Sequence, residues 1–128
     1  MSDMGCFSTS ITIENPARRG ESRFGGHALV DTGSEFTWVR REDLDALGIL
    51  PERLERFIVA DGREISREIG YAIVHVAGRS TNDDVVFAEP GDMVLLGARS
   101  LEGLNLRVDA QHKTLVPAGP VRAAVTAA

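Results

Sequence analysis

The sequence is poor in cysteine and in aromatic residues, and it has no long apolar run. Its single cysteine, Cys6, excludes an intrachain disulfide and a zinc site built from several cysteines. Aromatic residues make up only 5 % of the chain, so its core must consist mainly of Val, Leu, Ile and Ala. No segment approaches the roughly 20 apolar residues of a membrane helix, and the first ten residues lack the basic start and apolar run of a signal peptide. We therefore expect a cytoplasmic protein with no membrane partner.

The charge and length of the chain indicate which partners are unfavoured and how many domains to expect. Lys and Arg number 14 against 19 Asp and Glu, a formal net charge of −5. This acidic balance argues against a nucleic-acid partner, because a phosphate-binding protein normally presents a basic face. The 128 residues suffice for one globular domain with its own apolar core. We expect a single domain over residues 1–128, with a folded core at about 8–117 and a loose tail at 118–128.

The residue patterns predict many short strands and one or two short helices. Alternating and β-branched segments indicate strands, whereas Leu spacing, first-turn acids and a following Gly48 indicate a helix over 41–47. A second helix is expected over 100–104 with Ser100 as its N-cap, a further helical turn over 51–54, and a polar turn over 78–84. Strands are predicted at 8–14, 27–30, 36–39, 56–59, 65–72, 71–77, 85–88, 93–97, 106–109 and 113–116. The fold class is therefore all-β, a barrel or a sandwich.

One segment combines an apolar strand with a carboxylate and a small polar turn. It reads Ala-Leu-Val-Asp-Thr-Gly-Ser over residues 28–34. Thr32 and Ser34 can hydrogen-bond a carboxylate, and Gly33 permits close backbone approach. Taken alone, the segment is equally consistent with an Asp31 that only caps a turn.

Two motifs together resemble a known family. Residues 28–34, with Thr37 three residues later, resemble the active-site strand and loop of aspartic proteases, most closely the single-lobe, retroviral-type retropepsins. Residues 94–97 (Val-Leu-Leu-Gly) before the helix at Ser100 resemble the second family signature. The resemblance spans 8–117 and implies a closed, barrel-like acid protease lobe that is active as a homodimer, without cofactor or metal.

Aspartic proteolysis requires two carboxylates acting on one water. Two adjacent carboxylates do not both ionise, so one holds a proton while the other acts as base. This chain contains a single Asp-Thr-Gly, at residues 31–33, and therefore carries half of such a site. The expected function is that of a homodimeric aspartic endopeptidase with a peptide or protein substrate. The alternative is a non-catalytic, dimeric peptide-binding module on the same fold.

The resemblance implies a role for each residue of the first motif. Asp31 would be the general acid and base, and Thr32 would hydrogen-bond across the dimer axis. Gly33 would offer its carbonyl to substrate, Ser34 would hydrogen-bond the carboxylate, and Glu35 would hold the substrate backbone.

Further roles fall outside the first motif. Thr37 would support the loop from behind. The Asp-Gly turn at 60–63 predicts a hairpin, which the resemblance makes the flap over substrate, with Ala60, Asp61 and Gly62 in contact with it. The arginine that usually follows the second-signature glycine is displaced by one residue, to Arg99, where it would pair with Glu35.

Other chemistries are less favoured. His27 and Asp31 share one strand face, as a metal pair would, but the remaining histidines are far away in the sequence, and a structural His27 is the simpler interpretation. Cys6 has no adjacent histidine to activate it.

Overall fold

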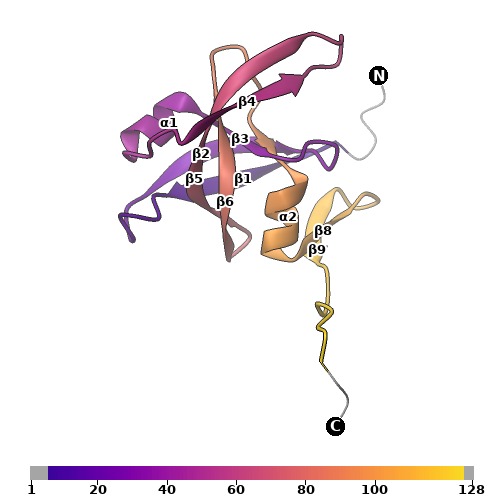
Figure 1. Cartoon of the computed structure of the whole chain (residues 1–128). Helices are drawn as coiled ribbons and strands as arrows, with labels where there is room; N and C mark the ends of the chain where they lie inside the picture. The colour runs from indigo at the N-terminus through magenta and orange to yellow at the C-terminus, as the bar shows by residue number, and fades with distance from the viewer. Residues whose placement is uncertain (1–5, 126–128) are drawn as a thin grey trace.

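The computed structural model describes residues 6–125, which form nine strands and two short helices (Figure 1). The strands are β1 (Ser8–Glu14), β2 (Ser22–Val30), β3 (Thr37–Arg40), β4 (Arg53–Ile58), β5 (Glu64–Val76), β6 (Arg79–Ala88), β7 (Leu95–Leu96), β8 (Leu106–Asp109) and β9 (Thr114–Pro117). The helices are α1 (Arg41–Ala46) and α2 (Ala98–Leu104).

Seven strands form one curled sheet in the order β1-β2-β7-β3-β6-β5-β4, and β1 also pairs with β5. β8 and β9 form a separate hairpin. The expected all-β class is confirmed, but the expected closed barrel is not. β4 has β5 as its one neighbour in the sheet, and β3 meets β7 through a single residue pair, Trp38 with Leu95. The sheet is therefore an incomplete barrel with an open edge at β4.

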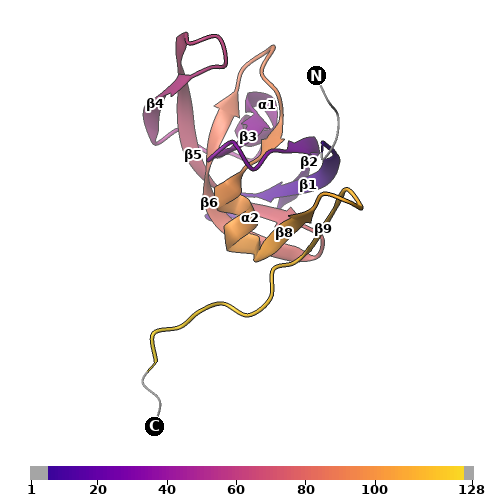
Figure 2. The same cartoon turned by 90° about the vertical axis from the view of Figure 1, so that its right-hand side faces the viewer.

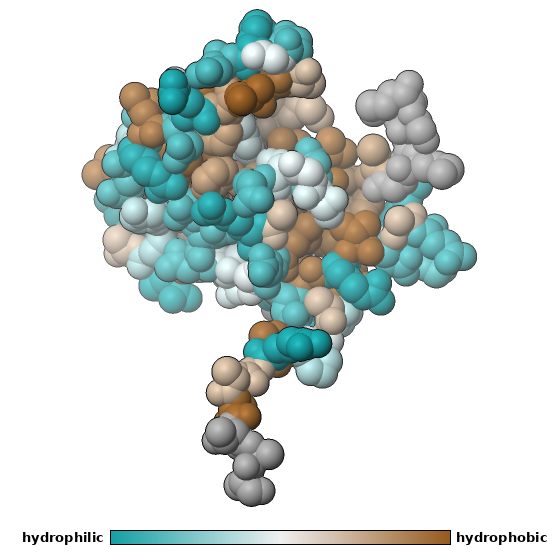
Figure 3. Space-filling view, turned by 45° about the vertical axis from the view of Figure 1, so that its right-hand side comes forward, coloured by the Kyte–Doolittle hydropathy of each residue, from teal (hydrophilic) through white to brown (hydrophobic). Residues whose placement is uncertain are grey.

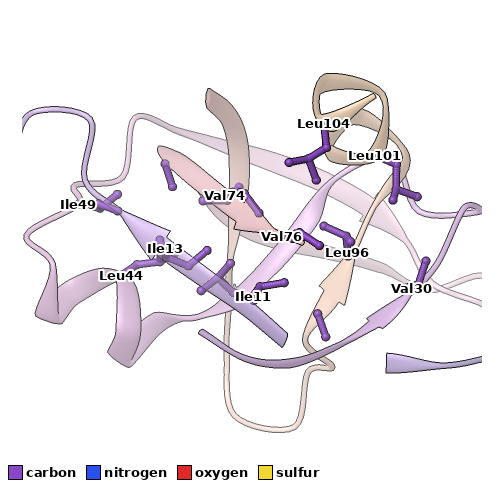
Figure 4. Close-up of a cluster of buried hydrophobic side chains, with 14 of the residues drawn as sticks. Ile11, Ile13, Val30, Leu44, Ile49, Val74, Val76, Leu96, Leu101 and Leu104 are labelled. Carbon is purple, nitrogen blue, oxygen red and sulfur yellow. The ribbon is translucent and has the colours of Figure 1, made fainter. Parts of the chain in front are cut away.

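The core is aliphatic, as the low aromatic content requires. Ile11 and Ile13 on β1 are fully buried and pack in one cluster with Val74 and Val76 on β5 (Figure 4). The alternation of β1 places these two isoleucines on one face of the strand. Phe87 is the aromatic side chain of this buried cluster.

Helix α1 follows its sequence signals. Acids occupy its first turn, Leu44 on its inner face is fully buried, and Gly48 adopts a positive φ of 72° just beyond its end. Asp43 is 1 % exposed, and its carboxylate accepts hydrogen bonds from Arg23 and Arg40. Because Arg23 lies on β2 and Arg40 on β3, these bonds fix the helix to the sheet while Leu44 packs into the core.

Two local expectations are wrong. Residues 51–54 do not form a helical turn, because β4 begins at Arg53 and pairs in register with β5 from Glu64 to Ile69. Residues 78–84 are not a turn either. β6 begins at Arg79, and the reversal occurs at Ala77 and Gly78, both with positive φ, as in a two-residue hairpin. The polar residues of β6 lie on the less buried part of the strand, which sequence reasoning read as a turn.

Three other boundaries shift. β2 extends back to Ser22, and the predicted strand at 93–97 shortens to β7. Helix α2 begins at Ala98 with Gly97 at its N-cap, so Ser100 is not the cap but a buried residue inside the helix. The C-terminal hairpin is confirmed, and residues 118–125 run away from it without strand or helix (Figure 2). Residues 126–128, the end of the expected tail, lie outside the described residues, as do residues 1–5.

Candidate active site

Asp31 stands where strand β2 ends, directly after the buried Val30. Strand β7 runs parallel to β2 and holds it there: Leu29 N–H donates to the Val94 carbonyl at 2.9 Å, and Asp31 N–H donates to the Leu96 carbonyl at 3.0 Å. The two motifs, far apart in the sequence, are therefore adjacent strands, and the second one fixes the backbone of the catalytic candidate.

A tight turn orients the Asp31 side chain. Ser34 N–H donates to the Asp31 carbonyl at 3.1 Å, and Gly33 N–H donates to Asp31 Oδ1 at 2.9 Å. A Cβ at Gly33 would lie 3.2 Å from that same oxygen, so a side chain would crowd the carboxylate. Asp31 is half-buried, and one of its oxygens is held by the backbone of its own loop.

Ser34 differs from its expected role. Its hydroxyl donates to the Phe36 carbonyl at 2.9 Å rather than to the Asp31 carboxylate. Its carbonyl accepts the Ala98 N–H at 2.7 Å, which joins the Asp31 loop to the start of α2. Ser34 therefore shapes the loop.

Behind the loop, Thr37 connects the two motifs through its side chain. Thr37 is fully buried, and its Oγ1 accepts the Gly97 N–H at 3.0 Å. A Cβ at Gly97 would lie 2.3 Å from the Phe36 carbonyl oxygen, so the approach of the two loops requires glycine there.

Glu35 and Arg99 lie at the edge of the site. The predicted pairing is confirmed, with 3.4 Å between Arg99 Nε and Glu35 Oε2, and the guanidinium also lies 4.4 Å from the centroid of the Phe36 ring. The pair is exposed, so its contribution to stability is about 1 kcal/mol at most.

The predicted hairpin forms between β4 and β5 and projects from the body of the domain (Figures 1 and 2). Its turn closes through Val59 N–H, which donates to the Arg63 carbonyl at 2.9 Å. Gly62 has a positive φ of 88°. The Arg63 backbone N–H and guanidinium both donate to the Asp61 carboxylate, which lowers the pKa of Asp61.

A cleft of about 910 Å³ separates this hairpin from the loop that carries Asp31. Asp31, Gly33, Ser34, Glu35 and Ala60 are among the residues that line it. Asp61 and Gly62 do not line it, because the hairpin tip points beyond the cleft.

Aromatic side chains form one wall of the cleft. Phe57 on β4 packs edge-on against Phe36, with 5.7 Å between ring centroids, and it lies 5.0 Å from Trp38. Sequence reasoning missed this wall. The available signal was that Phe36, Trp38 and Phe57 each occupy a predicted strand, but their meeting depends on the strand order.

Thr32 faces a different part of the surface. It is exposed and borders a separate hollow of about 330 Å³ beside α2 and β8. Its other lining residues are Ala98, Leu101, Glu102, Asn105, Leu106, Arg107, Val108 and Ala118. Figure 3 shows apolar atoms above the point where the C-terminal tail leaves the domain. The loop thus presents Asp31 to the cleft and Thr32 to a partly apolar surface.

Within residues 6–125, no three His, Cys, Asp or Glu side chains are arranged to hold a metal ion. His27 is exposed, and its Nδ1 lies 3.3 Å from Ser10 Oγ. In the same described region, no helix has the length and apolarity to cross a membrane.

Comparison with known proteins agrees with this geometry. The aspartyl protease family model matches residues 19–100, a stretch that contains both motifs, and the chain therefore belongs to the aspartyl protease family. The solution structure of the simian foamy virus (mac) protease superposes with a TM-score of 0.51 at 21 % identity, covering 75 % of this chain and 92 % of that one. That likeness shows a shared retropepsin-like fold. No curated protein matches the sequence.

Proposed function

We propose that this protein is a homodimeric aspartic endopeptidase that hydrolyses peptide bonds with a water molecule activated between two Asp31 carboxylates, one from each subunit. The observation that carries the proposal is the position of Asp31, backbone-fixed on the loop opposite a projecting hairpin, in a chain with one Asp-Thr-Gly. Family membership supports the chemistry, and the single motif supports the dimer.

In the proposed mechanism the paired carboxylates share one proton, because two adjacent negative charges do not both persist. The ionised Asp31 takes a proton from water as the water oxygen attacks the peptide carbonyl. The protonated Asp31 gives its proton to the carbonyl oxygen. Collapse of the tetrahedral intermediate then breaks the C–N bond: the Asp31 that took the proton from water gives it to the leaving amine, and the other Asp31 regains a proton from the intermediate's hydroxyl as the carbonyl re-forms.

The cleft suits an extended peptide. The Gly33 backbone and Glu35 lie beside Asp31 to bind substrate backbone, and the aromatic wall supplies apolar contact. The hairpin is the candidate flap: its closure would exclude water from the reacting carbonyl. Of the three hairpin residues expected to contact substrate, Ala60 lines the cleft.

The exposed face of Thr32 is the candidate dimer surface. An isologous interface brings the same patch of two subunits together. Because Thr32 follows Asp31 directly and borders a partly apolar hollow, pairing through this face would bring the two Asp31 loops near one axis.

Substitution of Asp31 by Asn tests the chemistry. We expect Asp31→Asn to lower peptide cleavage at least about 100-fold, because loss of a general base costs about 10²–10⁴ in rate. The matched control is Asp45→Asn, an exposed aspartate on α1. Cleavage should be greatest at acidic to mildly acidic pH. Equal cleavage by the Asp31→Asn variant would refute the proposal, and peptide binding without turnover at any pH would favour the peptide-binding module.

Substitution of Ala118 by Arg tests the dimer surface. Ala118 is exposed in the hollow beside Thr32, so a large charged side chain there should weaken association at least tenfold in sedimentation experiments. Ala110→Arg, in the exposed β8–β9 turn outside that hollow, is the control. An unchanged dimerisation constant would place the interface elsewhere.

A further inference from the structure

A chain of buried hydrogen bonds runs from the second motif to a carboxylate outside the site. Gly97 N–H donates to Thr37 Oγ1 at 3.0 Å, Thr37 Oγ1 lies 2.6 Å from Ser100 Oγ, and Ser100 Oγ donates to Asp83 Oδ2 at 2.9 Å. Thr37 and Ser100 are both fully buried. The chain connects β3, α2 and β6, which are distant in sequence.

The two ends of this chain set its direction. A backbone N–H only donates, and an ionised carboxylate only accepts. Ser100 uses its one hydroxyl proton toward Asp83, so Thr37 must donate to Ser100, and the Thr37 oxygen is left to accept the Gly97 N–H. Every hydroxyl is then satisfied as both donor and acceptor. A buried hydroxyl without an acceptor is unfavourable, so removal of Asp83 would disturb the bond between Ser100 and Thr37 and the bond between Thr37 and Gly97.

The hydrogen-bond chain affects the candidate active site because the two residues after Gly97 bond to the loop that carries Asp31. Ala98 N–H donates to the Ser34 carbonyl at 2.7 Å, and Arg99 N–H donates to the Glu35 carbonyl at 3.1 Å. The backbone at 97–99 thus holds the loop that carries Asp31, and Thr37 and Ser100 hold that backbone from behind.

We propose that Asp83 is a positioning residue of the candidate active site: its carboxylate ends the hydrogen-bond chain through Ser100 and Thr37 and thereby fixes the Gly97 backbone against the Asp31 loop. The proposal rests on the proposed peptidase function. Asp83 does not line the cleft, so it acts through its neighbours and not on substrate.

The surroundings of Asp83 disfavour the charged form of its carboxylate. Burial raises the pKa of Asp83 although Ser100 and the Asp84 backbone N–H both donate to it. The charged groups that act on it are Asp84 beside it on β6 and Arg99 on α2. Asp84 is in turn paired with Arg53 and Arg99. The hydrogen bond that the Asp83 carboxylate accepts from Ser100 offsets part of the cost of burying its charged form.

The test compares three variants of the full-length chain. Asp83→Ala removes both acceptor oxygens, whereas Asp83→Asn keeps one oxygen to accept from Ser100 and turns its NH2 group toward the Asp84 backbone N–H. Asn82→Ala truncates the exposed neighbour on the same strand and is the control. Ser100→Ala interrupts the chain at its middle and serves as a second variant if Asp83→Ala fails to fold. The readouts are hydrogen exchange of the Gly97 amide, followed by NMR, and kcat and KM for peptide cleavage.

We expect the Gly97 amide to exchange roughly tenfold to hundredfold faster in Asp83→Ala and Ser100→Ala, and at the wild-type rate in Asp83→Asn and Asn82→Ala. In the same two chain-breaking variants, kcat should fall about tenfold with KM nearly unchanged, and Asp83→Asn should restore it. Unchanged Gly97 exchange in Asp83→Ala overturns the proposal, as does an Asn variant as impaired as the Ala variant. If wild-type protein shows no peptidase activity but Gly97 responds as expected, the proposed function fails and the hydrogen-bond chain stands.

Discussion

Gly97→Ala should destabilise the protein through a single methyl group. The new Cβ would lie 2.3 Å from the Phe36 carbonyl oxygen and 2.6 Å from the Phe36 carbonyl carbon. Both atoms belong to the backbone, so neither can rotate away as the end of a side chain would. To relieve the overlap, the second motif must move away from the Asp31 loop.

The loss of stability can be estimated from the packing and the hydrogen bonds that this movement would disrupt. Overpacking a well-filled interior costs about 1–3 kcal/mol. Separation of the loops would also lengthen the bonds from Ala98 N–H to Ser34 and from Arg99 N–H to Glu35, each contributing about 1 kcal/mol. The free energy of unfolding should therefore fall by about 3–5 kcal/mol. For a domain of this size, that corresponds to a Tm lowered by about 10–20 °C.

Thermal unfolding followed by circular dichroism measures this directly. The control is Gly62→Ala, where no atom lies within 4 Å of the added Cβ. Only its φ of +88° is unfavourable for alanine, at about 1 kcal/mol, so the control should lose much less stability. A Tm for Gly97→Ala within a few degrees of wild type, with peptide cleavage retained, would refute the close approach of the two motifs.

Two further predictions concern acid stability and the hairpin. Hydrogen bonds from the Gly20 backbone, Arg19 and His75 lower the pKa of Glu14 from an ordinary 4.5 to about 2. Its charged form therefore stabilises the fold above pH 4.5, and this contribution is lost as the pH falls from 4.5 to 2. Glu14→Gln should flatten the dependence of Tm on pH in that window, and a dependence equal to wild type would contradict it. At Gly62, no atom lies within 4 Å of an added Cβ, but φ is +88°. Gly62→Ala should thus strain only the hairpin turn, by about 1 kcal/mol, and raise KM severalfold with little change in Tm; an unchanged KM would argue against the hairpin as a flap.

Much of the fold was predictable because its signals are local. Alternation located β1, the Asp-Gly pair located the β4–β5 turn, and first-turn acids with Gly48 located α1. The errors arose where local and tertiary signals differ. Residues 53–54 and 79–84 lack apolar alternation because neither face of these strand segments is fully buried, and only pairing with β5 shows them to be strand.

The candidate site divides in the same way. The residues of the 28–34 motif and their family resemblance could be taken from the sequence, as could the pairing of Arg99 with Glu35. The bond from Ser34 to Phe36, the aromatic wall and the chain ending at Asp83 could not. The Ser34 bond depends on the exact conformation of its loop, and the other two depend on how segments distant in the sequence pack in space.

The amino-acid sequence by itself determined an aliphatic all-β domain with one Asp-Thr-Gly, on which the proposal of a two-carboxylate site shared by two subunits rests. It did so because side-chain alternation and turn chemistry act over a few residues. Only the tertiary structure decided that β7 lies beside β2, that Asp31 opens on the cleft while Thr32 opens on a different surface, and that Asp83 is connected to the active loop. Those facts follow from strand order and from hydrogen bonds between residues as much as 65 positions apart, as Asp31 and Leu96 are, which no local pattern encodes.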